Sequence, residues 1–112
     1  MKILHFAPYY EPYLRDGSKT LTIRLNNRQK LRSGDQVSVC IGWTADQRDA
    51  LFQARIEQVA HIKLRQLTAD DLTQESPDCR NVEAAALMLS AIYRRLIDTH
   101  QAVYAIRFRC LD

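Results

Sequence analysis

The chain carries alternating β-strand patterns near both of its ends, and this feature restricts its fold more than any other. Residues 20–25 place threonine and arginine on one side of an extended chain and leucine and isoleucine on the other. Residues 36–41 alternate in the same way, with β-branched side chains in phase. By the same reading, three further strands are expected at 2–7, 51–61 and 102–110. The strand at 51–61 is expected to have a bulge or bend near Val59.

Helices are expected in the intervals between these strands. Residues 9–16 are predicted to form a short helix that Gly17 ends. Thr68 is predicted to cap a second helix that runs to about Glu75. The longest helix is expected to begin at a cap formed by Asp78 or Asn81 and to run to about Ile97, because apolar residues recur there at helical spacing.

Five strands and two or three helices indicate an α+β fold. The arrangement that fits best is a small mixed or antiparallel β-barrel with helices covering its ends. A length of 112 residues supports one modest core, so a single domain over residues 1–112 is expected. No apolar run approaches the roughly 18 residues that a membrane span needs, and no membrane partner is expected.

The cysteines and histidines give no metal-binding pattern. Three cysteines form an odd set without a C-x-x-C pair, which argues against a disulfide framework and favours a reducing cytoplasmic environment. Cys40 and Cys110 fall within strand patterns and are expected in the core, whereas Cys79 is expected to be exposed, without a base partner. The histidines lack the spacing of metal ligands, so neither a metal nor another cofactor is expected.

The positive charge is modest but concentrated. The net charge is +3, and 12 of the 16 basic residues are arginine, whose planar fork suits phosphates and base edges. Between Tyr13 and Gly34, six basic residues stand against one acid. A basic face of this kind is compatible with an anionic polymer such as RNA, and also with a surface that only keeps the protein dissolved.

One motif has a recognisable likeness. Residues 17–24 read Gly-Ser-Lys-Thr-Leu-Thr-Ile-Arg, and a Gly34-Asp35 turn into a strand follows ten residues later. This pattern resembles the ASCH domain, a PUA-like β-barrel family associated with RNA. The order of Leu67-Thr68, Gln74-Glu75, a helix ending Ala-Ile-Tyr and a last strand is similar to that of the small bacterial ASCH proteins that deacetylate N(4)-acetylcytidine.

The resemblance implies a cleft for a nucleobase and a role for each of three residues. Lys19 would be the general base, Thr22 the nucleophile and Glu75 the proton donor. Arg24 would shape or charge the cleft. Further contacts to substrate or RNA are expected from Thr20, Trp43, Tyr104 and Arg107.

Chemistry sets conditions on this assignment. A threonine hydroxyl needs a base within hydrogen-bond reach, and a lysine can serve only if desolvation or a neighbouring cation such as Arg24 lowers its pKa. Glu75 needs burial or a nearby carboxylate to hold a proton. Lys19 and Thr22 would face opposite sides of a regular strand, so they converge only if Lys19 lies in the turn after the helix.

Three functions remain open at this point. The first is a metal-independent amidohydrolase that deacylates N(4)-acetylcytidine or a related modified nucleoside. The second is a non-catalytic RNA-binding module, and the third is an RNA-cleaving ribonuclease. The partner is accordingly a modified nucleoside or RNA. Each site residue also has a purely structural interpretation, as a solvated lysine, a strand threonine or a solvated glutamate.

Overall fold

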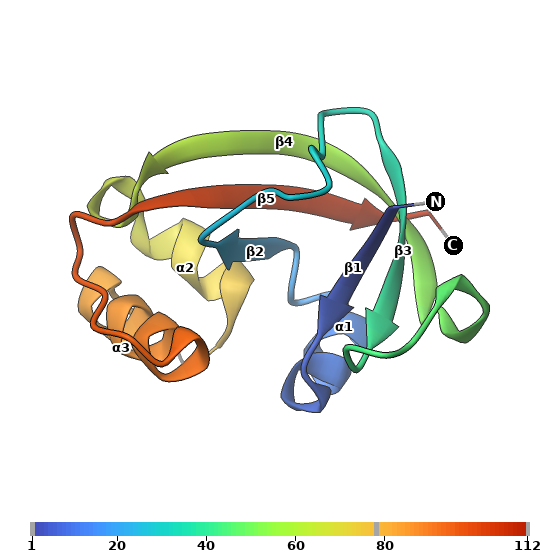
Figure 1. The fold of residues 1–112 in the computed structure, drawn as a ribbon, viewed down its shortest axis with the longest axis horizontal. Coiled ribbons are helices and arrows are strands. Elements are labelled where there is room, and N and C mark those ends of the chain that lie inside the picture. The colour runs from blue at the N-terminus through green and yellow to red at the C-terminus, as the bar shows by residue number, and fades with distance from the viewer. Residues whose placement is uncertain (1, 78, 112) are drawn as a thin grey trace.

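In the computed structural model, which describes residues 2–77 and 79–111, five strands form one mixed sheet in the order β1–β3–β4–β5–β2 (Figure 1). Only β1 and β3 pair in parallel. The α+β class is confirmed, but the sheet does not close into a barrel between β1 and β2. The strands are β1 (Lys2–Phe6), β2 (Leu21–Arg24), β3 (Gln36–Ile41), β4 (Phe52–Lys63) and β5 (Ala102–Cys110).

The register of β4 against β5 shifts between Ile56 and Gln58, so the predicted irregularity lies there, slightly before Val59. The helices fall in the predicted intervals. Short 3-10 turns accompany them: η1 (Pro8–Tyr10), η2 (Gln47–Asp49) and η3 (Leu64–Gln66). The α-helices are α1 (Glu11–Arg15), α2 (Ala69–Glu75) and α3 (Val82–Tyr93).

Side-chain caps set where α2 and α3 begin. Thr68 Oγ1 accepts a hydrogen bond from the Asp71 amide at 3.2 Å, and the Asp71 carboxylate accepts one from the Thr68 amide at 2.9 Å. This reciprocal cap confirms the predicted start of α2. At α3 the cap is Asn81, whose Oδ1 accepts from the Ala84 amide at 2.8 Å. The alternative cap, Asp78, lies outside the described residues.

The third helix is shorter than its apolar pattern predicts. It ends at Tyr93 rather than near Ile97, because Arg94 adopts a left-handed conformation with φ of +55°. That conformation cannot continue a right-handed helix. Ile97 is nevertheless buried, so the apolar pattern reports burial correctly and helix length wrongly.

Two groups of buried side chains make up the core. In one, α2 and α3 pack against β2 and β5, with Leu72 and Leu89 among the buried residues. In the other, η1 and α1 pack against β1, β3, β4 and the second half of β5, around Phe6 and Phe108. Figure 1 shows these two sets of helices at opposite ends of the long strands β4 and β5, with β2 between them.

The buried cysteines are not the pair that the sequence predicts. Cys40 is buried in β3, as expected. Cys110 is exposed, because the last two residues of β5 run beyond the core. Cys79 is buried against α2 and α3.

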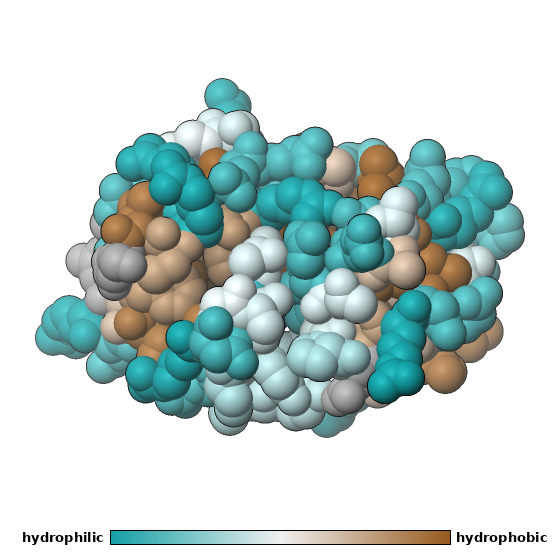
Figure 2. All heavy atoms as spheres, turned by 180° about the vertical axis from the view of Figure 1, so that it is seen from behind, coloured by the Kyte–Doolittle hydropathy of each residue, from teal (hydrophilic) through white to brown (hydrophobic). Residues whose placement is uncertain are grey.

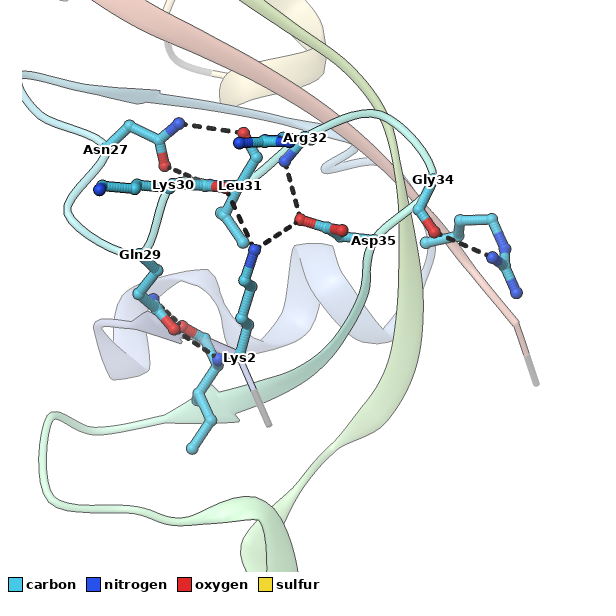
Figure 3. A network of polar contacts seen from close by, with 10 residues as sticks. Lys2, Asn27, Gln29, Lys30, Leu31, Arg32, Gly34 and Asp35 are labelled. Atoms are coloured by element: carbon cyan, nitrogen blue, oxygen red, sulfur yellow. Dashed lines mark hydrogen bonds and ion pairs between the residues drawn. The ribbon is translucent and has the colours of Figure 1, made fainter.

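The loop between β2 and β3 is tied to β1 by side chains (Figure 3). Lys2 forms an ion pair with Asp35 at 2.9 Å and donates to the Lys30 carbonyl at 3.1 Å. Gln29 accepts from the Ile3 amide at 2.8 Å and donates to the Ile3 carbonyl at 2.5 Å. A side-chain amide therefore occupies the outer edge of β1 in place of another strand.

Seen from behind, the middle of the surface is hydrophilic and hydrophobic residues gather at both ends of the long axis (Figure 2). One of these ends carries α3. On it Leu87 is 73% exposed, and Leu96, just after the helix, is 95% exposed.

The core assignment predicts unequal effects of two truncations. Phe108→Ala is expected to lower the free energy of unfolding by about 3–5 kcal/mol, because the ring is buried among aromatic and aliphatic side chains. Leu96→Ala, at an exposed position, is expected to change it by less than about 0.5 kcal/mol. Urea denaturation measures both values, and similar losses in the two variants would contradict the assignment.

Candidate functional site

Lys19 lies in the turn between α1 and β2, as its convergence with Thr22 requires. Gly17 adopts a φ of +81°, which redirects the chain after α1, and the Lys19 amide donates to the Tyr13 carbonyl at 3.0 Å. β2 begins only at Leu21, so strand alternation does not separate Lys19 from Thr22. Both side chains are buried and line the same cavity.

Lys19 and Glu75 form a buried ion pair. Lys19 Nζ lies 2.6 Å from Glu75 Oε1, and the two side chains are 1% and 3% exposed. The ammonium also donates to the Glu75 carbonyl at 2.7 Å and to the Leu21 carbonyl at 2.9 Å. The other carboxylate oxygen of Glu75 accepts from the Ile23 amide at 2.8 Å. All three donors of the ammonium are therefore directed to Glu75 and Leu21, and none to Thr22.

The ion pair occupies the open edge of β2. Leu21, Ile23 and Leu25 direct backbone groups away from β5. Lys19 donates to the Leu21 carbonyl, and Glu75 accepts from the Ile23 amide. The Tyr93 hydroxyl accepts from the Leu25 amide at 3.3 Å. Side chains thus complete the hydrogen bonding of an edge that another strand would otherwise cover.

Burial is the main influence on the pKa of Lys19. Desolvation lowers this pKa, the negative charge of Glu75 opposes the decrease, and the Arg24 cation adds to it. Both conditions set by the chemistry, desolvation and a neighbouring cation, are present. Burial also raises the pKa of the Tyr10 hydroxyl, whose ring centre lies 4.4 Å from Lys19 Nζ. The phenol therefore stays neutral beside the ammonium.

Arg24 connects the two open edges of the sheet. Its Nε donates to Thr22 Oγ1 at 3.1 Å, and its Nη2 donates to the His5 carbonyl of β1 at 2.7 Å. The guanidinium lies over Phe6, 5.0 Å from the ring centre. Burial lowers the pKa of Arg24, which nevertheless stays charged because its ordinary pKa is so high. No acceptor among the described residues is hydrogen-bonded to Nη1.

The side chains of Lys19, Thr22, Arg24 and Glu75 line one cavity of about 430 Å³, here called the Lys19 cavity. Its volume is within the roughly 300–1,000 Å³ typical of small-molecule sites. Aromatic rings of Phe6, Tyr10 and Tyr93 contribute to its wall. Trp43 also lines it, is 67% exposed and lies 6.3 Å from the His5 ring between centres. A planar ligand would meet aromatic faces and buried cations together.

Three of the expected contact residues do not line this cavity. Arg107 donates to the Gln74 side chain at 2.6 Å and pairs with Asp71, both on α2. Thr20 Oγ1 donates to the same Gln74 oxygen at 3.3 Å. Tyr104 stacks on His61 with 4.2 Å between ring centres. Thr20 and Arg107 therefore hold α2, which carries Glu75, against the sheet.

Several lining residues carry no sequence signal that assigns them to a site. Tyr10 belongs to an aromatic cluster beside a short helix, which is as typical of a core as of a binding surface. Tyr93, Met88 and Ile92 reach the cavity from α3, where helical spacing predicts only an apolar face. Arg28 comes from the β2–β3 loop, and only its positive charge in a basic stretch could have suggested it.

Between residues 2–77 and 79–111, no group of three or more histidine, cysteine, aspartate or glutamate side chains is placed to hold a metal ion. None of the helices described there is long and apolar enough to cross a bilayer.

Comparison with known proteins identifies the fold. No protein-family profile and no curated protein sequence matches the chain. Solved structures do match. A crystal structure of an ASCH domain from Lactobacillus crispatus JV V101 superposes with a TM-score of 0.66 at 14% identity, over 97% of this chain and 79% of that one. The chain has the fold of an ASCH domain.

Two other solved structures share this ASCH fold. A hypothetical protein superposes with a TM-score of 0.73 at 15% identity, over 99% of this chain and all of that one. A protein of Enterococcus faecalis V583 from the DUF984 family gives a TM-score of 0.61 at 16% identity, over 87% of this chain and 66% of that one. At these identities the likeness concerns the fold alone.

The buried pair predicts a pH-dependent loss of stability when one partner is neutralised. Glu75→Gln is expected to lower the free energy of unfolding by about 3–5 kcal/mol at neutral pH, because it leaves the Lys19 charge buried without its counterion. The pKa of Lys19 in the folded variant lies further below its ordinary value of 10.5. Between these two pKa values the unfolded chain binds more protons, so the variant regains stability as the pH rises toward 10.5.

Urea denaturation from pH 6 to pH 10 measures this recovery. Glu57→Gln is a matched control, since Glu57 is 52% exposed and its ion pair with Arg109, at 3.7 Å, lies at the surface, where such pairs contribute little to stability. A deficit in Glu75→Gln that stays constant over this range would show that Lys19 does not titrate as proposed.

Proposed function

We propose that the chain is an amidohydrolase that removes the acyl group from N(4)-acetylcytidine or a related N(4)-acylated nucleoside in the Lys19 cavity. The observation that carries the proposal is the buried Lys19–Glu75 pair, which shares one cavity with the Thr22 hydroxyl. Hydrolysis of an exocyclic amide needs a base, a nucleophile and an acid, and these three groups are present together.

The ion pair can supply the base and the acid by moving one proton. Transfer from Lys19 Nζ to Glu75 Oε1 over 2.6 Å converts the ammonium and carboxylate into a neutral amine and a carboxylic acid. Burial lowers the pKa of Lys19 and so favours its neutral amine, because a charged group loses more hydration than a neutral one when water is excluded. The amine then has a lone pair that can accept a proton, and Glu75 has a proton to donate.

The reaction then proceeds in two stages. Lys19 takes the proton of the Thr22 hydroxyl, and Thr22 Oγ1 attacks the acyl carbon to form a tetrahedral intermediate. Glu75 protonates N4, the C–N bond breaks and cytidine leaves, so that the ion pair is restored and Thr22 carries the acyl group as an ester. Water then hydrolyses the ester, which releases the carboxylic acid and regenerates the hydroxyl.

Arg24 supports two parts of this scheme. Its bond to Thr22 Oγ1 engages the oxygen as an acceptor and leaves the hydroxyl hydrogen for a base. Its Nη1 can donate to a carbonyl oxygen, on which negative charge develops in the transition state of acyl transfer. The surrounding aromatic rings suit the two faces of a pyrimidine.

Substitution of two threonines separates catalysis from fold. Thr22→Val keeps the side-chain shape and removes the nucleophile, so hydrolysis of N(4)-acetylcytidine is expected to fall by about a thousandfold or more. Thr73→Val is the matched control, because Thr73 is exposed on α2 and does not line the cavity, and it is expected to retain activity within a few-fold. Liquid chromatography of cytidine release measures both, and equal activities would remove Thr22 from the mechanism.

Lys19→Met examines the base. It is expected to reduce turnover by at least about a hundredfold, since the methionine fills similar space and accepts no proton. Thermal melting of the variant checks that it is folded. Wild-type turnover that persists in folded Lys19→Met would assign the base elsewhere, and absence of turnover in the wild type would reject the amidohydrolase.

A second candidate function is RNA binding without catalysis. It is favoured by the exposed basic side chains of the β2–β3 loop, namely Arg28, Lys30 and Arg32, beside a cavity with an exposed tryptophan. A base could enter the cavity while these side chains contact phosphates. RNA titrations at several salt concentrations examine it: Lys30→Ala should flatten the dependence of log K on log salt by about one unit.

A further inference from the structure

A second cavity, of about 360 Å³, adjoins the Lys19 cavity. The two cavities share part of their walls, since both are lined by Ala7, Tyr10, Met88 and Ile92. Their chemistry differs. The Lys19 cavity holds buried charged groups, whereas the second is lined mainly by alanines, aromatic rings and thioether or aliphatic side chains. It is here called the apolar cavity.

A thin partition separates the two cavities. The Tyr10 hydroxyl donates to Met88 Sδ at 3.4 Å, which links η1 to α3 across the boundary. A thioether is a weak acceptor, and methionine has three rotatable side-chain bonds. Met88 can therefore swing aside at little cost. Tyr10 stands beside the reactive amine, 4.4 Å from Lys19 Nζ to the ring centre.

We propose that the apolar cavity receives the hydrocarbon chain of the acyl group, so that the chain acts on N(4)-acylcytidines with acyl groups longer than acetyl. This proposal rests on the proposed function, which places the acyl carbon at Thr22 beside Lys19. A longer straight chain would enter the apolar cavity where the two cavities share Tyr10 and Met88 as lining residues.

The lining supports this occupant. Cys79 lines the apolar cavity, and burial raises the pKa of its thiol to about 11, so it is uncharged at neutral pH. Ala7, Ala84 and Ala91 leave room where larger side chains would fill the space. Each methylene that leaves water for such a site is favourable, which an enzyme expresses as a higher kcat/KM.

A series of substrates measures the effect. For the wild type, kcat/KM is expected to rise about fourfold per methylene from N(4)-acetylcytidine through N(4)-butanoylcytidine to N(4)-hexanoylcytidine. Ala84→Phe fills the apolar cavity and should lower the ratio of hexanoyl to acetyl kcat/KM at least tenfold. Leu87→Phe, on the same helix at a position that lines neither cavity, should keep the wild-type ratio.

Binding of analogues that cannot be hydrolysed distinguishes failure of this proposal from failure of the proposed function. N(4)-hexylcytidine should bind at least tenfold more tightly than N(4)-methylcytidine by calorimetry, and Ala84→Phe should remove the difference. If no acyl substrate turns over but this preference is found, the hydrolase is rejected and the apolar site stands. If acetylcytidine is hydrolysed and the chain-length profile is flat, or if neither alkyl analogue binds, the apolar site is overturned.

Discussion

The site and the part of the core formed by α2 and α3 both depend on the ion pair between Lys19 and Glu75. It is nearly excluded from water, and removal of two charges from water is unfavourable unless geometry and further hydrogen bonds compensate. Two carbonyls and one amide provide that compensation here, and all of them belong to β2 or to the end of α2. The pair therefore fixes how α2 lies on the sheet, and α2 in turn brings Leu72 into the core.

An open sheet explains why the polar groups converge. A closed barrel would pair the backbone of β1 with that of β2, leaving no need for side chains at either edge. Here Gln29 hydrogen-bonds the open edge of β1, whereas Lys19 and Glu75 hydrogen-bond the open edge of β2. Arg24 of β2 donates to the His5 carbonyl of β1 and so connects the two edges. Polar side chains that complete an incomplete sheet thus also line the cavity, so architecture and chemistry use the same groups.

The strands could be predicted from the sequence because period-two alternation is local, and the cap of α2 because Thr68 and Asp71 lie three residues apart. For Lys19, the sequence set only a condition, that it converges with Thr22 if it lies in the turn after the helix, and the likeness to ASCH domains implied a role for it in a cleft. Pattern alone could not show that Arg107 faces α2 or that Tyr104 stacks on His61. Alternation says that neighbours face opposite sides, but which side borders a cavity depends on helices distant in sequence. The end of α3 at Arg94 was unpredictable for another reason, since arginine rarely adopts a left-handed conformation.

The sheet order has a consequence for biosynthesis. Residues 21–24 of β2 pair with residues 104–107 of β5, so the two halves of this pairing leave the ribosome about 80 residues apart. Until β5 is made, β2 lacks its only strand partner and α2 has no finished sheet to cover. Such non-local pairing slows folding. The nascent chain therefore acquires its charged cavity only after β5 has been made, with both charges of the pair hydrated until then.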